Sequence, residues 1–128
     1  MKLKHILMKP LTNKEEEVMK ILWRLKKGFV KDILEAYKGQ QEIPHYNTLS
    51  TMVRNLEEKG YVAYKAYGKT HEYFPVISKE SYRAVFMEKA ISDFFSDSYA
   101  HLVSQFAREE KISINELKEI IKLIEKNK

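Results

Sequence analysis

Residues 45–76 read HYNTLSTMVRNLEEKGYVAYKAYGKTHEYFPV, and the spacing of apolar side chains changes once within this stretch. Up to Gly60 the apolar residues recur every three or four positions, which predicts an amphipathic helix that ends at that glycine. From residue 61 polar and apolar side chains alternate on both sides of a Gly-Lys-Thr turn, which predicts a β-hairpin over residues 61–76. The predicted buried stripe of the helix consists of Tyr46, Leu49, Met52, Val53 and Leu56.

The polar face of this predicted helix has an unusual composition, because it has no carboxylate before Glu57. Short amides and hydroxyls propagate a helix poorly, yet with an arginine they can donate to phosphates and reach base edges in a DNA major groove. The face is therefore either a DNA-reading surface or a solvated helix face that is poor in charge. Its members are Asn47, Thr48, Ser50, Thr51, Arg54 and Asn55.

Two helices are predicted before this one. The sequence TNKE at residues 12–15 is a capping box, so the first helix should start at Thr12 and end at Gly28. Its predicted buried stripe is Val18, Met19, Leu22 and Leu25, with Trp23 at the edge. A short second helix with Val30, Ile33, Leu34 and Tyr37 at helical spacing should stop near Gly39, and Pro44 then precedes the third helix.

Three helices followed by a hairpin is the order of elements in a winged helix-turn-helix domain. In that architecture the third helix lies in the major groove and the hairpin tip reaches neighbouring backbone or minor groove. We therefore expect a mainly α fold with a small β-hairpin, in which residues 1–77 form a winged-helix DNA-binding domain. The candidate DNA-binding residues are Tyr46, Asn47, Thr48, Ser50, Thr51 and Arg54 on the helix, and Lys65, Lys69, Thr70 and His71 in the hairpin.

Residues 78–128 are predicted to be all-helical. Ser78 can cap the first of three helices, the sequence SDS at residues 96–98 interrupts it, and Ser113 with Glu116 forms a capping box for the last. Three helices of this length cannot bury their many large apolar side chains among themselves, so a two-fold related second copy is predicted. Packing on the winged domain is the alternative. The candidate dimerisation residues are Tyr82, Phe86, Phe94, Leu102, Phe106, Leu117, Ile121 and Ile124.

Composition limits the class of protein. The chain has 128 residues, 44% of them hydrophobic, and no cysteine, which excludes disulfides and cysteine metal sites. The first 11 residues lack the apolar core of a signal peptide, and no run is long enough to span a membrane, so a cytoplasmic protein is expected. The net charge of +5 arises wholly in residues 1–77, which is typical of a region that faces a polyanion.

Catalysis and metal binding are not expected. His5, His45, His71 and His101 form no pair at metal-ligand spacing, and no glycine-rich phosphate loop is present. The carboxylate runs at residues 15–17 and 109–110 fall at predicted helix ends, where solvated charge is ordinary. We therefore predict no catalytic residue, no metal site and no cofactor.

Four segments together resemble the penicillinase and methicillin-resistance repressor family, which also contains copper-operon repressors. They are LTNKEEEVMKILW, YNTLSTMVRNLEEKGYV, YGKTHEYFPVISKE and HLVSQFAREEKISINELKEI, and they extend over nearly the whole chain. The resemblance implies a homodimeric transcriptional repressor that binds an inverted-repeat operator in double-stranded DNA and dimerises through its C-terminal helices.

In the β-lactamase branch of that family, a membrane-bound sensor-protease that responds to β-lactam cuts the repressor at an Asn-Phe bond. The resemblance places the corresponding bond at Gln105-Phe106, with glutamine in place of asparagine, although Phe106 also fits as a core residue of its helix. The cysteine cluster of the copper-sensing branch is absent. The family arginine at the position of Asn55 is replaced here by Arg54, which changes its direction by about 100 degrees on a helix.

A winged-helix protein-protein interaction module is the alternative to a repressor, because one fold can serve different functions. In that case the hairpin residues Tyr61, Tyr64, Tyr67 and Tyr73 would anchor a partner. The simpler interpretation of these tyrosines is cross-strand pairing and core packing.

Overall fold

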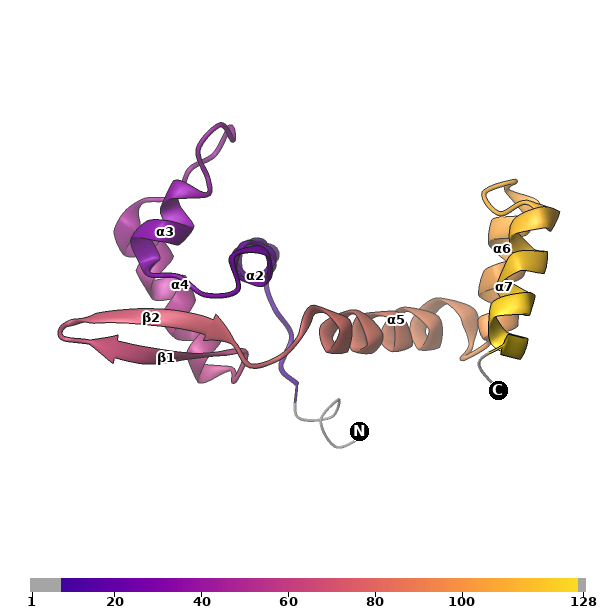
Figure 1. Cartoon of the computed structure of the whole chain (residues 1–128). Coiled ribbons are helices and arrows are strands. Elements are labelled where there is room, and N and C mark those ends of the chain that lie inside the picture. The colour runs from indigo at the N-terminus through magenta and orange to yellow at the C-terminus, as the bar shows by residue number, and fades with distance from the viewer. Residues whose placement is uncertain (1–7, 127–128) are drawn as a thin grey trace. The chain divides into compact units, whose positions relative to one another are not determined.

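A computed structural model describes residues 8–126 of the chain. The elements are α2 (Asn13–Leu25), α3 (Val30–Glu35), α4 (Tyr46–Glu58), β1 (Val62–Tyr67), β2 (Thr70–Pro75), α5 (Lys79–Phe95), α6 (Tyr99–Arg108) and α7 (Ile114–Lys126). The chain divides into two compact units at Arg83, within α5 (Figure 1). The predicted domain boundary after residue 77 stays a prediction. Residues 1–7, which include His5 and most of the segment predicted to lack a signal peptide, and residues 127–128 lie outside the described part.

Helix α2 begins as its sequence predicts. The Thr12 hydroxyl accepts a hydrogen bond from the Glu15 amide at 3.1 Å, and the Glu15 carboxylate accepts one from the Thr12 amide at 2.9 Å. Its predicted end at Gly28 is wrong, because the helix ends at Leu25 and Lys26 takes a positive φ of 74°. Leu25 is also 37% exposed rather than buried, since it lies in the last turn.

The core of the first unit lies where α2, α3 and α4 meet the hairpin. The helices contribute these fully buried members: Val18, Met19 and Leu22 of α2, Ile33 of α3, and Leu49, Val53 and Leu56 of α4. Tyr37 and Tyr61, which lie outside the helices, are also fully buried. Three predicted stripe residues of α4 are thus confirmed, and Met52 is partly buried against them. Tyr46 is the exception: it is 51% exposed, because it lies in the first turn, beyond the core.

Helix α3 ends at Glu35, earlier than the predicted stop near Gly39. The chain continues to Gln40 in hydrogen-bonded turns, in which the Tyr37 amide donates to the Leu34 carbonyl at 3.0 Å. Tyr37 is buried all the same, and burial together with Glu17 raises the pKa of its hydroxyl to about 12. The predicted burial of Tyr37 therefore holds although its helix is shorter.

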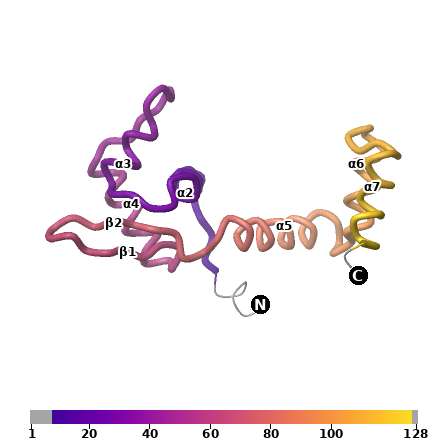
Figure 2. Tube along the Cα trace, in the orientation of Figure 1, coloured from indigo at the N-terminus to yellow at the C-terminus, as the bar shows by residue number. Residues whose placement is uncertain are grey.

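Strands β1 and β2 form the predicted antiparallel hairpin (Figure 2). Tyr64 of β1 lies opposite Tyr73 of β2. Gly60 ends α4 with a φ of 83°, as predicted, and leads into β1. Gly28 adds a short bridge to the hairpin, because its amide donates to the Tyr73 carbonyl at 2.9 Å and its carbonyl accepts from the Tyr73 amide at 2.8 Å. Backbone hydrogen bonds therefore tie the start of α3 to β2.

The carboxylate run at residues 15–17 is not uniformly solvated, which corrects the prediction. Glu15 is only 4% exposed and forms an ion pair with Lys59 beyond the end of α4. Glu16 accepts a hydrogen bond from the Tyr82 hydroxyl at 2.6 Å. Two of the three carboxylates, those of Glu15 and Glu16, are therefore held by contacts within the protein and are not simply solvated.

Helix α5 starts at a Ser78 cap, as predicted, because the Ser78 hydroxyl accepts from the Ser81 amide at 3.1 Å. The Tyr82 ring packs inside the first unit, with its ring centroid 5.6 Å from that of Trp23 and 6.0 Å from that of Tyr61. Trp23 in turn donates its indole N–H to the Ile77 carbonyl at 2.9 Å. This aromatic cluster anchors the beginning of α5.

The second unit has the predicted helix boundaries. Ser96 and Asp97 adopt positive φ between α5 and α6, and both hydrogen bonds of the capping box between Ser113 and Glu116 are present before α7. Ile91 is the one buried hydrophobic residue among the described residues of this unit. Large apolar side chains are exposed along all three helices: Phe86, Met87, Phe94, Tyr99, Val103, Ile114, Ile120, Ile121, Leu123 and Ile124. Within residues 8–126 no helix is long and apolar enough to cross a membrane.

Candidate nucleic-acid interface

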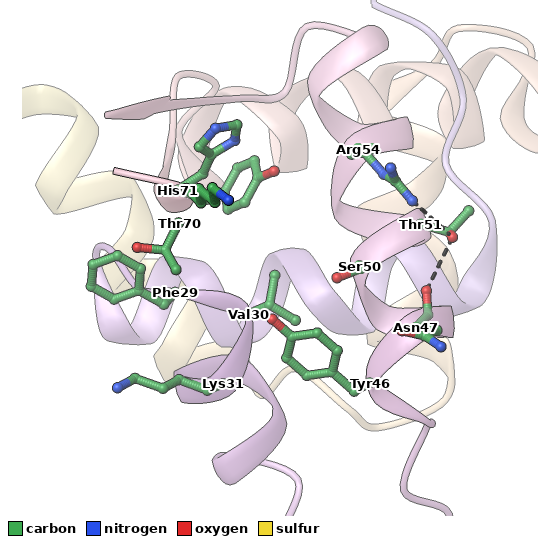
Figure 3. Close-up of a pocket in the computed structure, with 12 residues that line it drawn as sticks. Phe29, Val30, Lys31, Tyr46, Asn47, Ser50, Thr51, Arg54, Thr70 and His71 are labelled. Carbon is green, nitrogen blue, oxygen red and sulfur yellow. Dashed lines mark hydrogen bonds between the residues drawn. The ribbon is translucent and has the colours of Figure 1, made fainter. Parts of the chain in front are cut away.

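A groove of about 540 Å³ lies between α4, the hairpin tip and the beginning of α3 (Figure 3). Helix α4 supplies one wall with its polar face, and the turn between β1 and β2 supplies another. The groove is lined by Phe29, Val30, Lys31, Tyr46, Asn47, Ser50, Thr51, Arg54, Lys69, Thr70, His71 and Tyr73. No carboxylate is among these lining residues, whereas three of them carry a fixed positive charge. The residues that line the groove therefore present positive charge to a polyanion.

Most of the candidate DNA-binding residues come together here. Eight of the ten line the groove: Tyr46, Asn47, Ser50, Thr51, Arg54, Lys69, Thr70 and His71. The other two lie elsewhere. Thr48 faces a second cavity beside Lys14 and Tyr37, and the Lys65 ammonium lies 5.3 Å from the centre of the Tyr67 ring. Contact of any of the ten with DNA stays a prediction.

The sequence did not predict Phe29, Val30 and Lys31 as site residues, because helical spacing predicts core packing for Val30 and no local pattern indicates a role for the other two. The Gly28–Tyr73 bridge brings this segment to the hairpin, and the Asp32 carboxylate accepts from the Phe29 amide at 2.9 Å. Lys31 is exposed in the first turn of α3. The position of Lys31 in the first helix of a helix-turn-helix, the one that crosses the DNA backbone, was the signal available in the sequence.

The arginine of α4 has a defined neighbour. The Thr51 hydroxyl donates to the Asn47 carbonyl at 3.0 Å, and Nη2 of Arg54 donates to the same hydroxyl oxygen at 3.5 Å (Figure 3). Asn55, where the resemblance implies an arginine in the family, is exposed and does not line the groove. Arg54, one position earlier, does line it.

The hairpin wall is built from stacked rings. His71 stacks on Tyr64 with ring centroids 3.8 Å apart and 8° between the planes, and it meets Tyr73 edge-on at 6.1 Å. Burial raises the pKa of Tyr73, Glu57 raises it further and Arg54 opposes the shift. The rings fix the direction of His71 at the groove.

The candidate dimerisation residues differ in exposure. Phe86, Phe94, Ile121 and Ile124 are exposed, whereas Leu102, Phe106 and Leu117 are half-buried. Tyr82 is apart from them, in the aromatic cluster of the first unit. Gln105 and Phe106 lie inside α6, where the Gln105 side chain donates to Glu109 at 2.8 Å and accepts from Arg108 at 3.2 Å.

Among the described residues, no group of three or more histidine, aspartate or glutamate side chains is arranged to hold a metal ion. His5 lies outside those residues.

Comparisons with known proteins agree with this architecture. The sequence profile of a family described as penicillinase repressor matches residues 11–126. The methicillin resistance regulatory protein MecI of Mammaliicoccus sciuri is 23% identical over 116 residues, which cover 91% of this chain and 94% of that protein. MecI of Staphylococcus aureus strain Mu50 is 22% identical over the same length and coverage.

Two solved structures share the fold. The solution structure of the DNA binding domain of the repressor BlaI has a TM-score of 0.51 and 23% identity, covering 59% of this chain and 90% of that one. A complex structure of hsRosR-S4 has a TM-score of 0.50 and 20% identity, covering 84% and 95%. These likenesses confirm the predicted fold, a winged helix followed by a helical region.

Proposed function

The chain belongs to the penicillinase repressor family, and from that membership we propose that it is a homodimeric transcriptional repressor that binds an inverted-repeat DNA operator. The family is one of repressors, so the chain is not an enzyme. Its relatives are named as a methicillin resistance regulator and as a repressor with a DNA binding domain.

The groove between α4 and the hairpin is the single observation that carries the proposal. Helix α4 is 13 residues long and turns Asn47, Ser50 and Arg54 into the groove, where amide, hydroxyl and guanidinium groups can bond to base edges. Lys69 at the hairpin tip adds a charge suited to a phosphate. No carboxylate is among the lining residues, which favours an anionic ligand such as DNA.

Lys31 extends the proposed DNA-binding surface beyond the candidates found in the sequence. It is exposed at the start of α3, on the wall of the groove that lies apart from the hairpin tip. Lys31 and Lys69 both line the groove, and their positive charges suit contacts with DNA phosphates.

Exposed apolar side chains support the homodimer. Phe94 is 79% exposed, Ile114 72% and Leu123 60%, and α6 and α7 contain no buried residue. A monomer rarely leaves so many large apolar side chains in water, and a two-fold related copy offers the same apolar faces as a partner. We therefore assign dimerisation to α5, α6 and α7.

Relief of repression is proposed to be proteolytic, by a membrane-bound sensor-protease that responds to β-lactam. The bond Gln105-Phe106 lies within α6. The carbonyl of this peptide bond accepts a helical hydrogen bond from the Glu109 amide at 3.1 Å. Cleavage there would divide a helix of the proposed dimer interface. Incubation with the cognate protease followed by mass analysis tests the proposal, and a bond that stays intact under inducing conditions contradicts it.

The DNA-binding proposal is tested by an anisotropy competition at physiological salt. The inverted-repeat duplex upstream of the protein's own gene competes with a scrambled duplex of equal length. A preference of about a thousandfold or more is expected, because specific sites exceed non-specific ones by at least that factor. Equal, salt-sensitive binding of both duplexes would argue against sequence readout.

The protein-interaction module remains the second candidate, and the exposure of two hairpin tyrosines favours it. Tyr64 is 40% and Tyr67 47% exposed, whereas Tyr61 and Tyr73 are buried and unavailable to a partner. Two results together would favour this function over repression. The protein would bind no duplex at low salt, and capture of a protein partner would require Tyr64 and Tyr67.

A further inference from the structure

The direction of Arg54 decides what α4 can read, because an arginine side chain is long and carries about 2 kcal/mol of rotamer entropy. No ion pair joins Arg54 to a carboxylate within residues 8–126, so its charge is not neutralised there. Its hydrogen-bond partner in the groove is the hydroxyl of Thr51, one turn earlier on the same helix.

The Thr51 hydroxyl is itself held in place. Its proton is directed at the Asn47 carbonyl, 3.0 Å away, so the oxygen presents only lone pairs to the groove. Threonine in a helix can adopt this arrangement because its hydroxyl reaches the carbonyl four residues back. An arginine guanidinium has donors and no acceptor, so the two groups match.

From this geometry we propose that Thr51 is a positioning residue whose hydroxyl orients the Arg54 guanidinium for bidentate recognition of a guanine edge. The inference rests on the proposed DNA-binding function. While its proton bonds to Asn47, Thr51 has no donor to offer a base, so it acts through Arg54. Pre-orienting the arginine lowers the ordering cost that it would otherwise meet on binding DNA.

Four variants separate this role from direct contact: Thr51→Val, Thr51→Ser, Arg54→Ala and the double variant Thr51→Val with Arg54→Ala. Each is titrated with the operator and with operators in which single G·C pairs of a half-site are replaced. Valine keeps the shape of threonine and removes the acceptor, whereas serine keeps the hydroxyl. Circular dichroism melting of each variant monitors the fold.

Arg54→Ala is expected to lower discrimination at one G·C pair about 5- to 150-fold, the range for one bidentate contact. Thr51→Val should lower discrimination at that same pair about 2- to 12-fold, the range for ordering one long side chain. Thr51→Ser should stay within about twofold of wild type, and the double variant should equal Arg54→Ala, because neighbours that act as a unit are not additive.

Three results would overturn the inference: a Thr51→Val effect that is equal on all duplexes, one that adds in full to that of Arg54→Ala, or no effect. Each differs from failure of the proposed function. If the wild type does not prefer the operator, both proposals fail together. If the wild type prefers it and Arg54→Ala reduces the preference, any of the three results refutes only the role of Thr51.

Discussion

The Lys59 ammonium lies 2.6 Å from Oε1 of Glu15 and so joins the C-terminal end of α4 to the first turn of α2. Lys59 also donates to the Pro10 carbonyl at 3.1 Å. Burial raises the pKa of Glu15, but the hydrogen bonds from Lys59 and from the Thr12 amide outweigh it and hold the pKa below its ordinary value. The carboxylate is therefore charged in the folded protein, and the pair orients α4 against α2.

Replacing Lys59 by methionine is expected to destabilise the protein strongly. The variant leaves the Glu15 carboxylate, which is 4% exposed, without its charged partner. Breaking a buried ion pair costs about 3–5 kcal/mol, and the partial exposure of Lys59 reduces the expected loss to about 2–3 kcal/mol. Urea unfolding measures the change in the free energy of unfolding.

The matched control for that experiment is Lys14→Met. Lys14 forms an ion pair of 2.9 Å with Glu42, but both side chains are exposed. Exposed pairs contribute little, so no measurable loss is expected. Equal losses for the two lysine variants would contradict the assignment of a special role to Lys59.

The pH dependence of stability follows from the lowered pKa of Glu15. The unfolded chain takes up the proton first as the pH falls, with a pKa of about 4.3. The stabilisation is therefore complete above that value and is lost as the pH falls through the lower pKa of the folded state. The free energy of unfolding, measured from pH 3 to pH 7, should decline less steeply below pH 4.5 in Glu15→Gln than in wild type. Parallel curves would contradict this.

Local rules predicted the helix starts, and tertiary contacts explain the errors. The caps at Thr12, Ser78 and Ser113 depend on residues within three positions, so the sequence alone determines them. The burial of Glu15 depends on Lys59, 44 residues later, and no local pattern contains that contact. The end of α2 was placed too late because Lys26, which is not a glycine, takes the positive φ.

Tyr82→Phe is expected to lower the free energy of unfolding by about 1 kcal/mol without changing the dimer dissociation constant. The substitution removes the 2.6 Å hydrogen bond to Glu16 and keeps the ring packing on Trp23. Urea unfolding and analytical ultracentrifugation measure the two quantities. Tyr67→Phe, at an exposed tyrosine of the first unit, is the control. A changed dissociation constant with unchanged stability would instead support the predicted dimerisation role of Tyr82.

Ile121→Asp is expected to raise the dimer dissociation constant at least about 100-fold. Ile121 is 55% exposed in the single chain, and the proposed interface would bury it, where an unpaired charge costs about 3 kcal/mol. Ultracentrifugation over a concentration series measures the effect. Val76→Asp, at an apolar residue of the first unit that is 49% exposed, should leave the dimer intact. Dimers of unchanged affinity in Ile121→Asp would contradict the assignment to α7.

Lys31→Ala is expected to weaken binding to operator and scrambled DNA alike. Loss of one phosphate contact should reduce the slope of log affinity against log salt by about 0.9. Lys27→Ala is the matched control, because Lys27 is an exposed lysine that does not line the groove. Equal slopes for wild type and Lys31→Ala would exclude Lys31 from the interface.

The sequence predicted the part of the candidate site that lies on one face of α4 and on the hairpin turn. The polar face of α4 predicted Asn47, Ser50, Thr51 and Arg54 together, because helical periodicity alone places them on one side. Phe29 and Lys31 could not be found in this way. Their place in the groove depends on the pairing of Gly28 with Tyr73, two residues far apart in sequence.

That pairing is made by main-chain atoms alone, which affects how the protein can evolve. The spacing between the hairpin and the start of α3 is set by two amide-to-carbonyl hydrogen bonds that any residue other than proline can form. The exposed side chain of Lys69 at the hairpin tip takes no part in them. Mutations of Lys69 can therefore change how tightly DNA is bound at little cost to folding, so affinity can diverge while the scaffold stays the same.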